Sequence, residues 1–239
     1  NIITITMMLL FAEMNAAEIH ISSLEEFVFY ASESDNVITM APGEYILTDY
    51  LTADTVLARR NQGLFQFISF SGNNNIFNLE GVKIVVDTEL RYAYKPPMHT
   101  SEFLISRIGN TLVGLEISYF GKGTSPGGAA LEVAGDNNIL RNIILRVTGS
   151  YPYGYGDLFG KGGPSVIRHR KHSGLLVTGS NTSLFGCKLY MKSFGHGFFV
   201  QKNAENIYFE DCYVEGEVRE TDDILNETSG PALDVNFRT

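Results

Sequence analysis

Positive charge, cysteine and long apolar runs are all scarce in this sequence. Lys and Arg total 18 against 27 Asp and Glu, which gives the 239 residues a formal net charge of −9. A chain this acidic is a poor partner for the phosphates of nucleic acid, so we expect no nucleic-acid binding. No apolar run reaches the roughly 20 residues that a membrane-spanning helix needs, so no membrane span is predicted.

Stretches rich in Ala, Leu and Lys, which favour helices, are also nearly absent. Gly is abundant at 24 residues, and 44% of the residues are hydrophobic. The composition therefore excludes a disordered chain and supports a sizeable core. It also favours β-structure with many turns.

The two ends of the chain differ from the rest. Residues 2–12 form an apolar run, and Ala16 and Ala17 follow it. This pattern is typical of a secretory signal peptide, with a buried first strand as the alternative. We therefore expect a signal-peptide remnant at 1–17 and a secreted, periplasmic or cell-surface protein. Residues 18–239 are expected to form one domain that is incomplete at its C-terminus, because the strand pattern at 231–237 has no cap after it.

A loose repeat recurs along the chain: an apolar strand, a turn rich in Gly and Asn, and a second strand of alternating residues. The second strands are expected at residues 76–86, 112–117, 139–147, 184–191 and 207–214. The equivalent inward positions are then Val82, Leu115, Ile143, Cys187 and Cys212, with spacings of 33, 28, 44 and 25 residues. A minimum near 25 with loop insertions indicates a β-solenoid.

The predicted fold class is all-β, a right-handed parallel β-helix. One turn cannot bury its inward face alone, but stacked turns share a core, with parallel strands roughly 4.8 Å apart. Irregular repeat length argues against a left-handed hexapeptide helix. Residues 22–30 predict a short N-terminal capping helix in which Ser22 or Ser23 is the N-cap. Its buried face would hold Leu24, Phe27 and Val28.

The predicted helix, the Ala-Pro-Gly-Glu-Tyr turn at residues 41–45 and the Asn-bearing turns resemble the pectate-lyase-like right-handed parallel β-helix superfamily. The resemblance covers residues 18–239. It implies a secreted polysaccharide lyase or glycoside hydrolase, but the superfamily also holds epimerases, phage tailspikes and adhesins. Fold alone therefore does not decide the function.

The longest insertion, between Val147 and Leu175, combines basic side chains with tyrosines. Its basic residues are Arg168, His169, Arg170, Lys171 and His172, and its tyrosines are Tyr151, Tyr153 and Tyr155. A cationic face suits an anionic polysaccharide, and tyrosine rings offer flat faces to sugars. The alternatives are a solvated loop that balances the acids downstream, and tyrosines that only pack the loop onto the solenoid.

A Gly-His-Gly triplet centred on His196 lies one coil further on. Aligning the two coils places His196 beside Ser173, so Lys171, His172 and His196 are expected within about 5–8 Å on one side of adjacent turns. The alternative is a hydrogen-bonded histidine at a turn. The triplet is similar to an element of polygalacturonases, but the Asn-Thr-Asp and Arg-Ile-Lys elements that accompany it there are missing.

Acidic residues dominate the end of the chain. Residues 205–234 hold ten acids and a single basic residue, Arg219. Carboxylates of such a cluster can hold Ca²⁺, and the candidates are Glu217, Glu220, Asp222 and Asp223. The same four residues could supply the paired carboxylates of a hydrolase, which lie roughly 5–9.5 Å apart. The alternative is a solvated acidic loop.

Two cysteines, Cys187 and Cys212, fall at equivalent inward positions. In-register parallel neighbours point the same way, which suits the disulfide dihedral poorly. We therefore expect stacked, buried free thiols rather than a disulfide. No metal-ligand spacing involves them.

The leading hypothesis is a lyase that cleaves a uronic-acid polysaccharide by β-elimination. The reaction needs a group that neutralises the C6 carboxylate, a base at C5 and a proton donor at O4. The predicted base is Lys171, His172 or His196, and Arg168, Arg170 or Ca²⁺ would neutralise the carboxylate.

In the chondroitinase B and alginate lyase families that the chain resembles, Lys and Arg from neighbouring coils perform these tasks. Here Lys192 and Arg219 are secondary candidates, either for contact with the substrate or for the acid. The alternatives are a glycoside hydrolase and a non-catalytic carbohydrate-binding or adhesive solenoid. The expected partner is an anionic polysaccharide, Ca²⁺ is the only cofactor considered, and the protein is expected to be a monomer.

Overall fold

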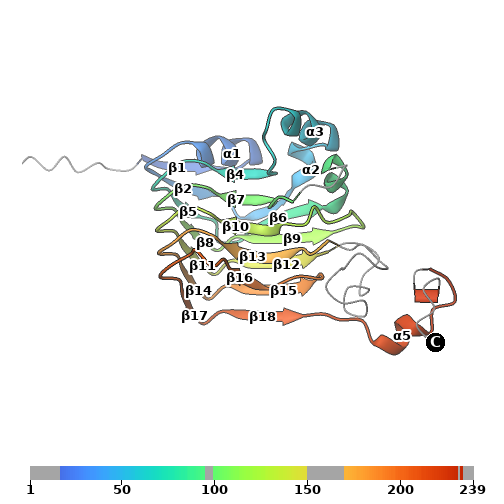
Figure 1. The fold of residues 1–239 in the computed structure, drawn as a ribbon. Coiled ribbons are helices and arrows are strands. Elements are labelled where there is room, and N and C mark those ends of the chain that lie inside the picture. Colours follow the sequence, from blue (N-terminus) through green and yellow to red (C-terminus); the bar gives the residue numbers. More distant parts are fainter. Residues whose placement is uncertain (1–16, 95–98, 150–169, 231, 234–239) are drawn as a thin grey trace, which may run out of the picture.

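The fold is a stack of coils whose strands form three parallel sheets (Figure 1). The computed structural model describes residues 17–94, 99–149, 170–230 and 232–233. The predicted signal-peptide remnant therefore lies outside the described residues, apart from Ala17. None of the helices in the described ranges is long and apolar enough to cross a membrane.

Each sheet collects one strand from successive coils, and every strand pair is parallel. Sheet A contains β1 (Ala17–Ile21), β2 (Asn36–Met40), β5 (Ile76–Asn78), β8 (Thr111–Val113), β11 (Ile139–Arg141), β14 (Ser183–Phe185) and β17 (Tyr208–Glu210). Sheet B contains β3 (Gly43–Ile46), β6 (Val82–Asp87), β9 (Glu116–Phe120), β12 (Ile144–Thr148), β15 (Lys188–Lys192) and β18 (Tyr213–Gly216). Sheet C contains β4 (Ile68–Phe70), β7 (Phe103–Ile105), β10 (Ala129–Val133), β13 (Ser173–Val177) and β16 (Phe198–Val200). The parallel solenoid predicted from the repeats is therefore present.

The register agrees with the predicted equivalence of inward positions. Lys83 pairs with Glu116, Glu116 with Ile144, Ile144 with Lys188 and Lys188 with Tyr213. The residues that directly precede these paired residues form one column, as the spacing predicted. They are Val82, Leu115, Ile143, Cys187 and Cys212. All but Cys212 in this column are buried.

The structure differs from the prediction in having three strands per coil rather than two. Each predicted second strand is bent into a strand of sheet A and a strand of sheet B. The residue at the bend has a positive φ, as at Gly114, Asn142, Gly186 and Asp211. Gly, Asn and Asp tolerate this left-handed conformation at low cost, so the bend is encoded by these residues.

The turn from sheet C to sheet A is held by a ladder of buried asparagine side chains. The backbone N–H of Asn75 donates to Oδ1 of Asn110 at 3.1 Å, and the N–H of Asn110 donates to Oδ1 of Asn138 at 2.8 Å. The side-chain amide of Asn110 donates back to the carbonyl of Gly72 at 3.0 Å. The Asn residues of the repeat therefore satisfy backbone groups inside the stack.

Helical elements lie at the N-terminal end of the stack and at the turns from sheet B. They are α1 (Leu24–Ser32), α2 (Leu47–Tyr50), α3 (Ala53–Asn61), the 3-10 helix η1 (Thr88–Tyr94) and α5 (Thr221–Leu225). The backbone N–H of Glu26 donates to the hydroxyl oxygen of Ser23 at 3.2 Å, so the predicted N-cap is present. Phe27 of α1 packs edge-on against Phe70 and Phe77 in the core.

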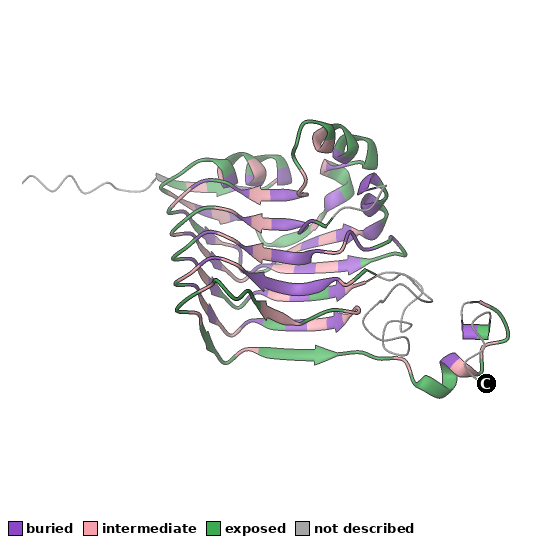
Figure 2. Ribbon diagram, in the orientation of Figure 1, coloured by how far each residue is buried: buried purple, intermediate pink, exposed green. Residues whose placement is uncertain are grey.

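Burial follows the inward rows until the last coil (Figure 2). Leu184 and Leu189 are fully buried, whereas their neighbours in the last coil, Phe209 and Val214, are 37% and 50% exposed. Within the described residues no coil stacks on β16, β17 and β18. The last coil therefore presents its inward side chains at an open end.

Candidate functional site

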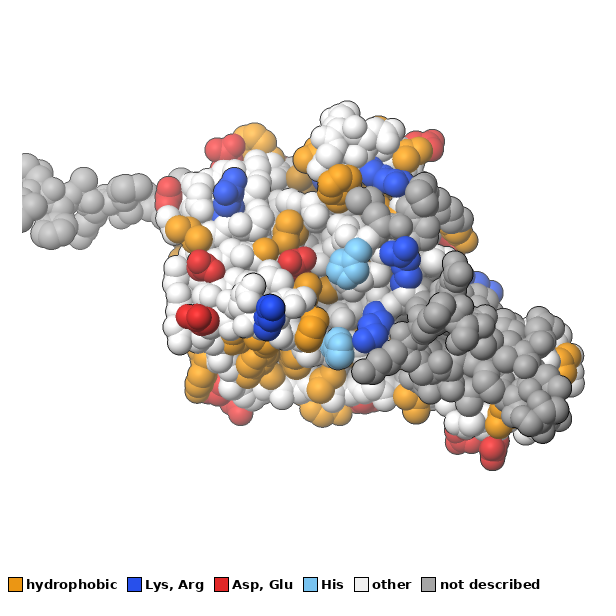
Figure 3. Space-filling model, viewed as in Figure 1, with side chains coloured by type: hydrophobic (Ala, Val, Ile, Leu, Met, Phe, Trp, Pro, Cys, Tyr) orange, Lys and Arg blue, Asp and Glu red, His pale blue; other side chains and the backbone are white. Residues whose placement is uncertain are grey.

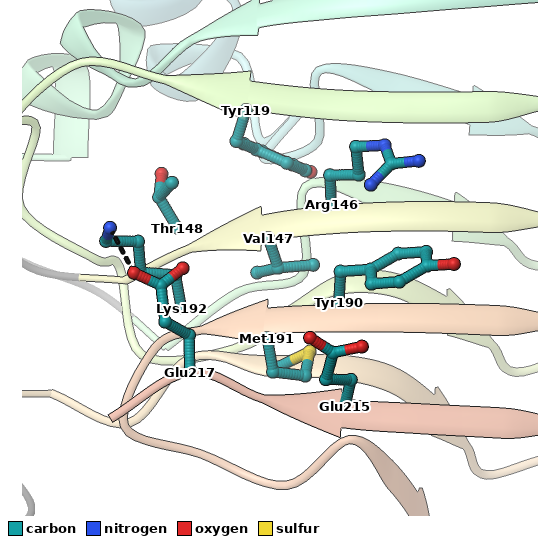
Figure 4. Close-up of a pocket in the computed structure, with 9 residues that line it drawn as sticks. All are labelled: Tyr119, Arg146, Val147, Thr148, Tyr190, Met191, Lys192, Glu215 and Glu217. Carbon is teal, nitrogen blue, oxygen red and sulfur yellow. Dashed lines mark hydrogen bonds and ion pairs between the residues drawn. The ribbon is translucent and has the colours of Figure 1, made fainter. Parts of the chain in front are cut away.

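An open groove runs across the outer face of sheet B, over strands β12, β15 and β18. Its volume is about 320 Å³. Arg146, Tyr190 and Glu215 form one side, and Thr148, Lys192 and Glu217 form the other (Figure 4). Strand pairing produces the two rows, because Arg146 is in register with Tyr190, and Tyr190 with Glu215. The groove therefore runs along the axis of the solenoid.

Ionic and aromatic contacts order one side of the groove. The guanidinium carbon of Arg146 lies 4.3 Å from the ring centroid of Tyr190, and Nε of Arg146 donates to Glu116 at 3.1 Å. The Tyr190 ring is 6.1 Å from the ring of Tyr213, whose hydroxyl donates to Glu215 at 2.9 Å. This row offers an aromatic face flanked by a cation and a carboxylate, a combination that suits sugar rings and their polar groups.

The other side of the groove carries an ion pair. The ammonium of Lys192 lies 2.5 Å from a carboxylate oxygen of Glu217 (Figure 4). Lys192 ends β15, and Glu217 follows β18, where its backbone N–H donates to the carbonyl of Met191. The ammonium is a proton donor and the carboxylate is a proton acceptor, so their contact places an acid and a base side by side in the groove.

Past Lys192 the chain turns a corner from sheet B to sheet C. On the outer side of this corner are His196, which is exposed, and Lys171, which is half-buried. The ring of His196 stacks on Phe199 at 4.6 Å, and the ammonium of Lys171 lies 5.9 Å from the ring centroid of Phe194. Histidines and Lys or Arg side chains lie near one another on the face that includes sheet C (Figure 3).

The predicted alignment of the two coils is present at this corner. Leu175 pairs with Phe198, so Ser173 stands opposite His196, whose backbone N–H donates to the Ser173 hydroxyl oxygen at 3.4 Å. The glycine before His196 is explained by packing, because a Cβ there would collide with the carbonyl of His172. The triplet therefore permits close stacking of the coils.

His172 does not share the outer face with its two neighbours, which corrects the expected cluster. Its side chain is fully buried and lies 3.0 Å, Nε2 to guanidinium nitrogen, from Arg91 of η1. The reason is alternation, since successive residues of an extended segment face opposite sides. A side chain enclosed in this way cannot reach a polysaccharide, so His172 is not retained as a base.

Beneath the corner, His172 belongs to a buried ionic cluster. Arg91 donates from Nε to Glu102 at 2.6 Å, and a second nitrogen lies 3.4 Å from the other carboxylate oxygen. The guanidinium also donates to the carbonyl of Gly149 at 3.3 Å, and it lies 5.3 Å from the ring centroid of Tyr119. Arg91 thereby ties together the chain on both sides of the long insertion, at Gly149 and at His172.

Burial and charge set the pKa values of this cluster. Burial alone would raise the pKa of Glu102, but the guanidinium of Arg91 and the adjacent His172 overcome it and lower the pKa to about 2. Burial, and then the positive charge of Arg91, lower the pKa of His172. Glu102 is therefore ionised and His172 neutral near pH 7.

The remaining predicted residues are scattered. Arg170 is exposed and donates to the carbonyl of Pro126 at 3.3 Å, and Arg219 pairs with Glu227. Glu220 precedes α5, and Asp222 and Asp223 are exposed on it. The other predicted residues lie outside the described residues: Arg168, His169, Tyr151, Tyr153 and Tyr155.

No group of three or more His, Cys, Asp or Glu side chains converges as a metal site within the described ranges. The acids proposed as Ca²⁺ ligands thus do not converge with a third side chain of these four types in the described part of the chain. The two cysteines are both free, with Cys187 buried and Cys212 half-buried.

Sequence reasoning missed Arg146, Tyr190 and Glu215. Each occupies a solvent-facing position of an alternating strand, where a charged or aromatic residue is common. The signal that could have found them is their shared column, because aligning the coils on Ile143, Cys187 and Cys212 puts the three residues in one row. A scan against protein-family models finds no match to this chain, and a search of curated proteins finds none.

Proposed function

We propose that the chain binds a uronic-acid polysaccharide in the groove on sheet B and cleaves it by β-elimination. The observation that carries the proposal is the contact between Lys192 and Glu217 at the edge of a groove whose other side holds Arg146 and Tyr190. The proposal includes the finer features of the fold class: right-handed winding, membership of the pectate-lyase-like superfamily and α1 as the N-terminal cap. It also includes export of the protein.

Each step of the β-elimination is assigned to a residue in the groove. Arg146 pairs with the C6 carboxylate and so stabilises the negative charge that develops beside C5. The Glu217 carboxylate accepts the C5 proton, the C4–C5 double bond forms, and the C4–O4 bond breaks as the Lys192 ammonium protonates O4. A proton transfer from Glu217 to Lys192 then restores both groups, so no net proton is gained or lost by the enzyme.

The other predicted residues have supporting places in this proposal. Lys171 and His196 lie on the outer side of the corner that follows Lys192. There they would contact the part of the acidic polysaccharide that extends beyond the groove. Ca²⁺ remains part of the hypothesis: Glu217, Glu220, Asp222 and Asp223 are the acids that would hold it, and it would help to neutralise the C6 carboxylate. Metal removal with a chelator tests it directly, because a metal-dependent lyase would lose activity.

The decisive experiment incubates the protein with polygalacturonate, alginate and chondroitin sulfate and follows absorbance of the unsaturated uronate product. One of the polymers should give this absorbance. Lys192→Met and Glu217→Gln should each lower the rate by roughly 10²–10⁴-fold, the usual contribution of a general acid or base. Lys188→Met and Glu205→Gln serve as matched controls, because both residues are exposed and lie outside the groove. Absence of the product with every polymer would overturn the lyase proposal.

A glycoside hydrolase is the second candidate, and one observation favours it. Glu215 and Glu217 are two residues apart and both line the groove. Residues at this spacing on a strand are about 6.6 Å apart along the chain, within the range of hydrolase carboxylate pairs. New reducing ends without the unsaturated product would favour the hydrolase. Binding with neither product would favour the non-catalytic, adhesive alternative.

A further inference from the structure

The residues that order the groove on sheet B have counterparts on the outer face of sheet A. Each counterpart lies five positions earlier in the sequence. The sheet A set is Arg141, Phe185, Tyr208 and Glu210, and the sheet B set is Arg146, Tyr190, Tyr213 and Glu215. We call the first set the sheet A ladder.

The contacts of the two sets also correspond. The guanidinium carbon of Arg141 lies 4.1 Å from the ring centroid of Phe185, compared with 4.3 Å from Arg146 to Tyr190. The ring of Phe185 is 5.7 Å from that of Tyr208. The hydroxyl of Tyr208 donates to Glu210 at 2.7 Å, and this hydrogen bond and the carboxylate charge raise the pKa of Tyr208.

Stacking between coils does not require this ladder. In the earlier coils the column that leads to Arg141 and Phe185 holds Thr39, Asn78 and Val113, so the parallel stack forms without aromatics there. Tyr208 is 51% exposed, and Arg141 is exposed as well. Phe185 is half-buried, and the guanidinium of Arg141 covers one face of its ring. The ring of Tyr208, the uncovered part of Phe185 and the cation are thus available to a ligand on the surface.

We propose that the sheet A ladder is a second binding surface for a polysaccharide chain that carries carboxylates. The rings are spaced by about one coil, close to the advance of one sugar in an extended glycan, so one sugar can pack on the ring of Tyr208 while the next contacts the uncovered part of Phe185. Arg141 supplies the cation for a carboxylate. The ladder lies outside the cleavage groove and holds the polymer without cutting it. The acidic nature of the ligand rests on the proposed function of the groove.

The test measures binding of the full chain by electrophoresis in gels that contain polygalacturonate or alginate, beside gels with a neutral glycan. Phe185→Ala and Tyr208→Ser should each weaken binding to the acidic polymer roughly three- to tenfold, the range expected for one aromatic contact. Arg141→Gln should weaken binding to the acidic polymer and leave retardation by the neutral glycan unchanged. Ile76→Ser is the matched control, because Ile76 is an exposed apolar residue on the same sheet at a distant coil.

Cleavage assays separate the ladder from the groove. Turnover of a short oligosaccharide should be unchanged in Tyr208→Ser and reduced in Tyr190→Ser. Wild-type binding by Phe185→Ala and Tyr208→Ser, with the fold of both intact by thermal melting, would overturn the ladder proposal. Weakened binding in these variants together with no cleavage of any polymer would support the ladder and contradict the proposed lyase.

Discussion

Arg91 and His172 meet inside the solenoid, 81 positions apart in sequence, with a nitrogen of the guanidinium 3.0 Å from Nε2 of the imidazole. Arginine has only donors, so Nε2 must accept and the proton of the neutral ring must be on Nδ1. Nδ1 is buried and has no hydrogen-bond partner among the described residues. A protonated ring would place two donors face to face, and the Glu102 carboxylate, whose oxygen lies 3.5 Å from Nε2, does not outweigh burial and the charge of Arg91.

This pairing makes stability depend on pH through His172. The pKa of His172 is lowered in the folded protein, so its contribution is fully present above the unfolded value near 6.5. The contribution is lost as pH falls below that value toward the folded pKa. We expect the free energy of unfolding, measured with urea, to decrease between pH 7 and pH 5.

His172→Gln is the matched variant for this prediction. The Gln carbonyl can accept from Arg91 and does not titrate, so the decrease between pH 7 and pH 5 should be smaller than in the wild type. Glu102, whose pKa of about 2 is also below its ordinary value, adds its own loss only under more acidic conditions, between about pH 4.5 and pH 2. An identical pH profile for the two proteins would contradict the assignment to His172.

Removing the carboxylate of Glu102 should destabilise the fold strongly. Glu102→Ala leaves the Arg91 guanidinium buried without its counter-ion, which typically costs about 3–5 kcal/mol. Chemical denaturation at pH 7 measures this change. Glu116→Ala is the control, because Glu116 pairs with the partly exposed Arg146 and such pairs contribute about 0–1 kcal/mol. Equal losses of stability in the two variants would show that the buried Arg91–Glu102 pair contributes no more than an exposed ion pair.

The asparagine ladder gives a third prediction. Asn110→Ala removes the acceptor for the N–H of Asn75 and the donor to the carbonyl of Gly72, and both groups lie at the buried turn. Each unsatisfied buried group costs about 1–3 kcal/mol, so a loss within or above this range is expected in urea denaturation. Asn203→Ala, at an exposed turn, should change stability by less than about 0.5 kcal/mol. An unchanged free energy of unfolding in Asn110→Ala would contradict the stabilising role of the asparagine ladder.

The sequence predicted the architecture better than the site, for a physical reason. Repeat spacing and alternation determine which residues stack, so the column through Ile143, Cys187 and Cys212 could be derived without coordinates. The bends into a third sheet depend on single residues with positive φ, such as Asn142, which look like ordinary polar positions of a strand. Identifying the site residues requires knowing whether a side chain next to a corner points into the core or out to solvent. His172 shows the difficulty, because one step of alternation separates an outer basic residue from a buried one.

The two cysteines should differ in reactivity. Burial raises the pKa of the Cys187 thiol to about 12, which keeps it protonated and enclosed, whereas Cys212 of the last coil is half-buried. Alkylation with iodoacetamide at pH 8, followed by peptide mass spectrometry, should modify Cys212 in the native protein. Cys187 should react at a comparable rate only after unfolding in urea. Fast native labelling of Cys187 would contradict its enclosed position.

Lys171 and Lys192 should affect cleavage in different ways, although both flank the same corner. The ammonium of Lys171 faces the ring of Phe194 at 5.9 Å, whereas that of Lys192 contacts the Glu217 carboxylate. Lys171→Ala should therefore raise KM for a uronate polymer with kcat nearly unchanged, because it removes binding that is equal in the ground state and the transition state. Lys192→Met should lower kcat, because the proton donor to O4 is lost. Steady-state rates from the absorbance of the unsaturated product separate the two effects. A fall in kcat for Lys171→Ala with normal turnover by Lys192→Met would move the chemistry from the groove to the outer side of the corner, where the sequence first placed it.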